Sequence, residues 1–98
     1  MIVQRYSLQY KNGKWDELLE LVKDGRKNLF SSLSMKVYSM DYGPNNMVVF
    51  DIEFEDQAEL DKLWEQTMAK EEWSPWIAKF GELTTEEGKV ELLTLEVS

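Results

Sequence analysis

Three charged side chains are spaced so that they could meet on one surface of a β-sheet. Arg5 lies in residues 2–10, where apolar and polar side chains mostly alternate, and Asp51 and Glu53 lie in a second alternating stretch, residues 47–54. If the two stretches are neighbouring strands, Arg5 meets one or both carboxylates, and charge-assisted hydrogen bonds there could orient a polar ligand. The structural alternative, an ion pair at an interface or at a barrel rim, is favoured because such networks are common without any catalytic role. Two carboxylates on one strand fall short of a coordination shell, so we predict no metal site.

An aromatic set provides the second candidate site. Its members are Tyr6, Tyr38, Trp64, Trp73 and Trp76. Their rings could line a pocket for a flat or apolar small molecule, and the phenol and indole groups could supply a few orienting hydrogen bonds. The structural alternative is a tryptophan-rich core, which is the commoner use of large aromatic side chains.

The composition excludes several kinds of chemistry. The chain has no Cys and no His, which excludes disulfides, thiol catalysis, histidine general bases and histidine ligation of zinc or haem. Its 19 acidic and 11 basic residues give a formal net charge of -8. This charge disfavours partners with phosphate backbones and anionic membranes, so we expect neither a nucleic-acid nor a membrane partner.

The length of 98 residues fits a single domain, residues 1–98. The first residues lack the basic and apolar regions of a signal peptide, and no stretch approaches the apolar length of a membrane span. These features predict a soluble, cytoplasmic protein.

A strand followed by a capped helix organises the chain. In residues 47–54 the side chains of Val48, Phe50, Ile52 and Phe54 point to one face, because successive side chains alternate across a sheet. After this strand, Asp56 is expected to cap a helix, with Glu59 completing a capping box. An apolar stripe at helical spacing then predicts the buried face, made of Leu60, Leu63, Trp64, Thr67 and Met68.

The other elements follow from periodicity and turn signals. In the first half they are a strand over residues 2–10, a helix from an Asn12 cap to Phe30 with Gly25 as a kink or early end, a strand over residues 35–42 and a turn over residues 43–46. In the second half they are a helix from a Ser74 cap through Pro75 to Gly81, a polar connection over residues 84–88 and a strand over residues 90–97.

The order strand, helix, strand, strand, helix, strand predicts an α+β fold. Its simplest form is the ferredoxin-like βαββαβ antiparallel sheet, with strand order 4-1-3-2 and helices on one face. The bare face would carry Val3, Met47 and Val49, with Leu93 or Leu95, an apolar patch that a monomer would rarely expose. Two such faces packed about a two-fold axis predict a homodimer, a dimeric α/β barrel.

Three short motifs in order carry a resemblance that covers nearly the whole chain. They are Arg5-Tyr6, the turn at residues 11–14 before a helix, and Glu72-Trp73 after the second helix. In this set the chain resembles the NIPSNAP-like branch of the dimeric α/β-barrel superfamily, although Asn12 and Glu72 stand where that pattern usually has Pro. The resemblance implies a homodimer with a cavity in each subunit between sheet and helices. Members of the superfamily include cofactor-free monooxygenases, haem-degrading enzymes and proteins without a known activity.

These observations leave three functions open. The first is a small dimeric protein of unassigned activity, without a cofactor, that holds a small organic ligand between sheet and helices. The second is a cofactor-free oxygenase or isomerase acting on a phenolic or polyketide-like substrate, for which Tyr, Trp, Arg or a carboxylate must handle protons. The third is a structural or regulatory interaction protein. Fold alone does not choose among them.

Overall fold

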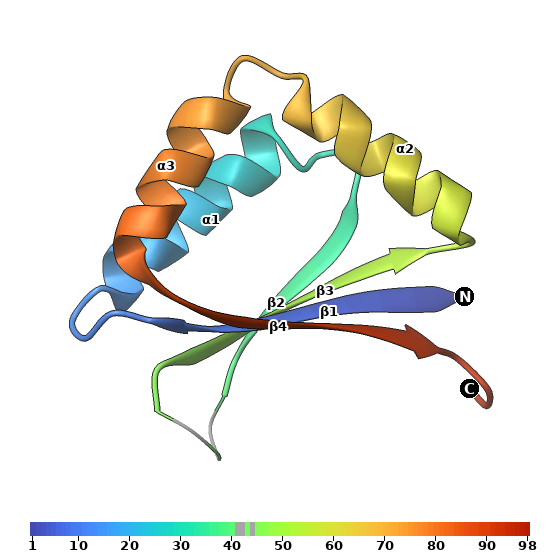
Figure 1. Ribbon diagram of the computed structural model, residues 1–98, viewed down its shortest axis with the longest axis horizontal. Helices are drawn as coiled ribbons and strands as arrows, with labels where there is room; N and C mark the ends of the chain where they lie inside the picture. The colour runs from blue at the N-terminus through green and yellow to red at the C-terminus, as the bar shows by residue number, and fades with distance from the viewer. Residues whose placement is uncertain (41–42, 44) are drawn as a thin grey trace.

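The computed structural model describes residues 1–40, 43 and 45–98. Seven elements follow one another along the chain: β1 (Ile2–Tyr10), α1 (Trp15–Asn28), β2 (Ser34–Ser39), β3 (Met47–Phe54), α2 (Gln57–Met68), α3 (Trp73–Leu83) and β4 (Thr84–Thr94). Figure 1 shows the strands as one layer with all three helices above it. The α+β prediction is confirmed.

The four strands form one antiparallel sheet in the order β2-β3-β1-β4. This is the predicted 4-1-3-2 order read from the other edge. β1 and β3 are central, and Arg5 stands directly opposite Asp51 in their register. The longest strand, β4, occupies one edge of the sheet.

The hydrophobic core lies between the helices and one face of the sheet. The alternation predicted for β3 is confirmed, because Val48, Phe50, Ile52 and Phe54 are all buried on the helix side. Leu18 and Val22 of α1, and Leu60 of α2, pack onto the same core. Burial of this apolar surface is the main force that holds the helices on the sheet.

Helix α1 begins later than the sequence indicated. Its first residue is Trp15, and its cap position, Lys14, makes no side-chain capping hydrogen bond. The predicted cap, Asn12, instead accepts a hydrogen bond from the amide of Asn46. Gly25 does not end the helix, which continues to Asn28, two residues short of the predicted Phe30.

The start of α2 agrees with the prediction in most respects. The Asp56 carboxylate accepts a hydrogen bond of 2.8 Å from the backbone N–H of Glu59. The Glu59 carboxylate accepts from the N–H of Glu55, at 3.3 Å, and not from that of Asp56. Leu60 and Thr67 are buried as expected, but Met68 is exposed because it lies at the end of the helix, beyond the core.

The last third of the chain departs most from the prediction. α3 begins at Trp73, before the predicted Ser74 cap, and runs past Gly81 to Leu83. The predicted polar connection at residues 84–88 is part of β4, because β1 extends far enough to pair with it from Ile2 to Tyr10. The Thr84 hydroxyl also donates to the carbonyl of Phe80, at 2.9 Å, where the helix passes into the strand.

Two further boundaries differ. β2 ends at Ser39, whereas the sequence predicted a strand over residues 35–42. Residues 41, 42 and 44, and with them part of the predicted turn, lie outside the described residues. The final strand ends at Thr94, although the N–H of Leu95 still donates to the carbonyl of Met1, at 3.0 Å. No helix in the described ranges is both long and apolar enough to cross a membrane.

Candidate functional site

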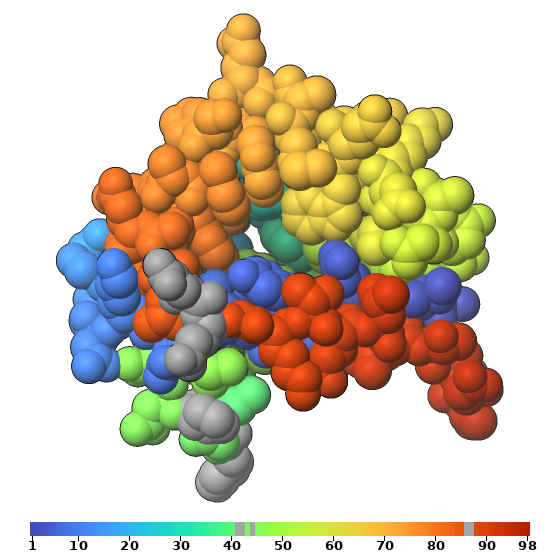
Figure 2. Space-filling view, in the orientation of Figure 1, coloured from blue at the N-terminus to red at the C-terminus, as the bar shows by residue number. Residues whose placement is uncertain are grey.

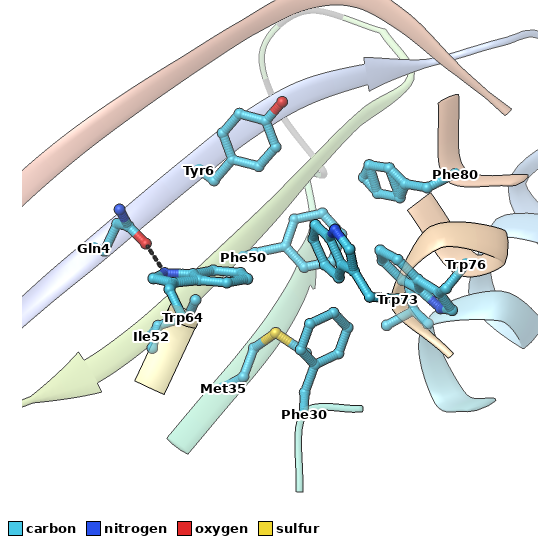
Figure 3. Close-up of a pocket in the computed structure, with 11 residues that line it drawn as sticks. Gln4, Tyr6, Phe30, Met35, Phe50, Ile52, Trp64, Trp73, Trp76 and Phe80 are labelled. Atoms are coloured by element: carbon cyan, nitrogen blue, oxygen red, sulfur yellow. Dashed lines mark hydrogen bonds between the residues drawn. The ribbon is translucent and has the colours of Figure 1, made fainter. Parts of the chain in front are cut away.

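A cavity of about 90 Å³ lies between the sheet and the helices. Figure 3 shows its aromatic lining, with Trp64 of α2 beside Gln4 on one side and Trp73, Trp76 and Phe80 of α3 on the other. The lining residues are Gln4, Tyr6, Val22, Phe30, Met35, Phe50, Ile52, Trp64, Trp73, Trp76 and Phe80. We call this cavity the aromatic pocket. Four of the five aromatic residues predicted from the sequence line it.

Trp64 is held in the pocket wall by a polar contact with the sheet. Its indole N–H donates to the side-chain carbonyl of Gln4, at 3.0 Å (Figure 3). Trp64 comes from α2 and Gln4 from β1, so the bond fixes the helix over the strand at this point. A half-buried indole N–H needs such a partner, because leaving it without one costs free energy.

Trp76 is fixed by α1. Its indole N–H donates to the backbone carbonyl of Leu21, at 2.9 Å. The ring lies so close to Gly25 that a Cβ on that residue would stand 2.5 Å from the indole nitrogen. Gly25 is therefore required for the close approach of α1 and α3, which explains a glycine inside a continuous helix despite its low helix propensity.

Phe30 joins the aromatic side chains into one cluster. Its ring makes edge contacts with Trp64, Trp73 and Trp76, at centroid distances of 6.2, 6.4 and 5.0 Å. Trp76 also stacks on Trp73 and on Phe80, with interplanar angles of 22° and 25°. Both arrangements are favourable for aromatic pairs. Large rings locked in this way leave a small space between them that they cannot fill themselves.

The pocket opens to the surface beside β4. Figure 2 shows a hollow bordered above by α2 and α3 and below by β1 and β4. Tyr6 lies at this opening and is 36% exposed. Its hydroxyl rests over Gly88 of β4, where an added Cβ would stand 2.9 Å from the phenolic oxygen. The glycine thus leaves room for the phenol at the pocket mouth.

The lining has few polar groups. Among the residues that line the aromatic pocket, none carries a charge, and the polar side-chain groups are the Gln4 amide, the Tyr6 hydroxyl and the indole N–H groups. The N–H groups of Trp64 and Trp76 already have partners. An ionised ligand would lose its hydration in such a site without gaining a counter-charge, so the chemistry favours a neutral molecule.

The charged candidates lie on the opposite face of the sheet. Arg5 and Asp51 form a bidentate ion pair, in which Nε and Nη2 of Arg5 each donate to one carboxylate oxygen of Asp51, at 2.9 Å. Hydrogen bonding to the Asp51 carboxylate raises the pKa of Arg5 above its ordinary value, and Coulombic attraction to Asp51 and Glu91 adds to it, against a lowering by burial. The predicted contact between Arg5 and Asp51 is confirmed. Glu53 does not join it and pairs with Lys36 instead, at 3.5 Å.

Tyr38 does not join the other aromatic residues. It pairs with Val49 in the β2–β3 register, and residues opposite each other point to the same face, so its ring lies on the bare side of the sheet. The expectation that it lines the same pocket as Tyr6 is therefore wrong. Within the described part of the chain, no group of three acidic side chains could hold a metal ion.

Several pocket residues were not predicted. Gln4 had a detectable signal, because it is the polar exception among the otherwise apolar helix-side positions of residues 2–10. Phe30, Phe50 and Phe80 had none, because their apolar patterns predict only burial and not which buried rings border a cavity.

Comparison with known proteins gives structural matches. No protein-family model matches the sequence, and no curated protein matches it. An uncharacterised NIPSNAP domain protein from Burkholderia xenovorans has a TM-score of 0.87 at 21% identity, with 97% of this chain and 94% of that chain covered. A NIPSNAP family protein from Agrobacterium tumefaciens has a TM-score of 0.83 at 18% identity, with 95% and 90% covered.

A protein described as an antibiotic biosynthesis monooxygenase is also similar, with a TM-score of 0.73 at 19% identity and 97% and 98% of the two chains covered. At these identities the similarity establishes the fold and not the activity. The chain thus has the ferredoxin-like α+β fold of NIPSNAP domain proteins and of this monooxygenase, which confirms the fold that the resemblance of its sequence implies.

Proposed function

We propose that this protein is a homodimer that binds a small, flat, neutral organic molecule in the aromatic pocket of each subunit. The observation that carries the proposal is the pocket itself, an opening into an uncharged aromatic lining between sheet and helices. Sites for small molecules are typically concave and largely apolar, with few polar groups that set the orientation of the ligand.

The size of the pocket limits what it can hold. Its volume of about 90 Å³ is less than that of an engineered apolar cavity, about 150 Å³, that holds benzene. However, the pocket is open on the β4 side, so a ring can enter by one edge while the rest of the molecule stays outside. A flat ring fits among the aromatic side chains of the lining better than a branched aliphatic group does, because planar groups stack.

A thermal-shift screen tests this binding. A panel of neutral aromatic compounds should raise the melting temperature by about 5 °C or more at ten times the dissociation constant, and matched aromatic carboxylates and aliphatic compounds should not. Filling the pocket with Met35→Phe should abolish the shifts. A screen without aromatic hits, or with hits that survive this substitution, would favour the structural or regulatory interaction protein.

The dimer is proposed from the bare face of the sheet. This face carries an apolar pair at each of two opposite corners, Val3 beside Leu93 and Tyr38 beside Val49, and ion pairs lie between them. Tyr38 and Leu93 remain 48% and 38% exposed in the single chain. Packing two such faces together would remove both apolar pairs from water.

Sedimentation equilibrium tests the dimer. Wild-type protein should have twice the chain mass at micromolar concentration, and Leu93→Lys should give a folded monomer, because it places an unpaired charge in the interface. Leu93 is a better position than Val49, which is already buried within the subunit and whose replacement would destabilise the monomer itself. A wild-type monomer would contradict the dimer.

A cofactor-free oxygenase or isomerase is the second candidate. It is supported by the similarity to the antibiotic biosynthesis monooxygenase and by the Tyr6 hydroxyl at the pocket mouth. In such an enzyme Tyr6 would exchange a proton with the substrate, so turnover of a phenolic substrate should fall at least about a hundredfold in Tyr6→Phe, with binding preserved.

A cytoplasmic location stays a prediction from the sequence.

A further inference from the structure

Two apolar side chains of β4 lie uncovered beside the pocket mouth. Val90 and Leu92 are 59% and 55% exposed. We call this pair the β4 shelf. In the β1–β4 register Val90 stands opposite Tyr6 and Leu92 opposite Gln4, two residues that line the aromatic pocket. Opposite residues point to the same face of the sheet, so the shelf lies on the helix side and continues the floor of the pocket outwards.

The shelf is also uncharged, in contrast to the other face of the same strand. The positions of β1 and β4 around it on the helix side are Ile2, Gln4, Tyr6, Gly88 and Thr94. On the bare side of β4, by contrast, Lys89 and Glu91 form an ion pair. The surface between pocket and shelf therefore suits a neutral, apolar group. Figure 2 shows that the hollow above β4 is open to solvent.

The pocket and the shelf together suit a molecule with two parts. The cavity admits one ring at most, whereas Val90 and Leu92 stand two residues apart and span about 7 Å along the strand. We propose that they form one site for a neutral ring carrying an alkyl chain, with the ring in the aromatic pocket and the chain on the β4 shelf. This inference rests on the proposed function and narrows its ligand class.

The test compares phenol with 4-butylphenol by NMR titration of the full chain. Each fully buried methylene improves affinity roughly fourfold, and the shelf covers a chain from one side only, so the butyl group should lower the dissociation constant about tenfold. In the double variant Val90→Thr/Leu92→Thr the gain should fall below about threefold, while the affinity for phenol stays within twofold. Thr keeps the strand propensity of these positions.

Leu93→Thr is the matched control, since Leu93 lies on the same strand but points to the other face. It should keep the tenfold gain. The gain is a ratio of two affinities of one variant, so a general loss of folding or assembly cancels from it. A wild type that binds phenol without a gain from the chain, or a gain that survives the double substitution, overturns the inference and leaves the proposed function standing.

Two other results have a different meaning. If phenol does not bind the wild type at all, the proposed function fails and this inference fails with it. If the double variant turns a wild-type dimer into a monomer, the shelf is an interface between two copies of the chain, and the inference is overturned on that ground.

Discussion

The two faces of the sheet differ in the side chains that they carry and in what covers them. On the helix side, β3 contributes only apolar side chains, and large rings from α2 and α3 close over them around a cavity. On the bare side the same strand contributes Asp51 and Glu53, which pair with Arg5 and Lys36 of the neighbouring strands. This difference is the reason that we propose ligand binding for the covered face and assembly for the charged and partly apolar bare face.

The largest difference between the faces should appear in stability. Phe50 packs between Tyr6 and Phe80 in the core, and Phe50→Ala should lower the free energy of unfolding by about 3–5 kcal/mol. Tyr38→Ala on the bare face should cost less than about 1 kcal/mol in the monomer. Urea unfolding at low protein concentration measures both, and equal losses would contradict the separation of core and bare face.

The second comparison uses two helical glycines. Gly25→Ala should destabilise the protein by about 1–2 kcal/mol, since the new Cβ displaces Trp76 and breaks its hydrogen bond to Leu21. Gly81→Ala should instead stabilise it by up to about 1 kcal/mol, because a Cβ there meets nothing within 4 Å and Ala is the better helix former. Thermal and urea unfolding should therefore give opposite signs, and a stabilised Gly25→Ala would show that Trp76 is not tightly held.

The two partners of the ion pair on the bare face should differ by the smallest amount. Arg5→Gln leaves the buried Asp51 carboxylate without its charged partner and should cost about 1–2 kcal/mol. Asp51→Asn leaves only Arg5, whose side chain is 42% exposed and can be hydrated, and should cost less than about 1 kcal/mol. A double-mutant cycle measures the coupling of the two residues. A larger loss of stability for Asp51→Asn than for Arg5→Gln would contradict the expectation that the Asp51 carboxylate relies on Arg5 more than Arg5 relies on Asp51.

Much of the fold could be predicted from the sequence, because alternation in residues 47–54 and the capped stripe after Asp56 each indicate one structure. The ends of elements were less predictable. Asn12 and Ser74 have side chains that are typical of helix caps. In the folded chain, however, the Asn12 side chain accepts a hydrogen bond from Asn46, and α3 begins at Trp73, before Ser74. The polar residues 84–88 indicated a loop, whereas pairing with a long β1 makes them a strand.

The candidate site was predicted in part. Arg5 and Asp51 could be matched because strand order and alternation together fix which residues face each other. Tyr38 was misplaced because its face depends on the β2–β3 register, which the sequence does not specify across residues 41–46. The cavity itself could not be predicted, since it arises from the way that Phe30 and three indoles fail to fill the space among them.

The four indole N–H resonances test most directly whether the aromatic pocket is the ligand site. Trp64, Trp73 and Trp76 line the pocket, whereas Trp15 packs on Tyr10 outside it, with a centroid distance of 5.1 Å, and so provides an internal control. In a titration of ¹⁵N-labelled protein with 4-butylphenol, the resonances of the three pocket residues should shift together and saturate, while that of Trp15 stays in place. A shift of Trp15 equal to the others, or no saturable shift of the three, would contradict the account.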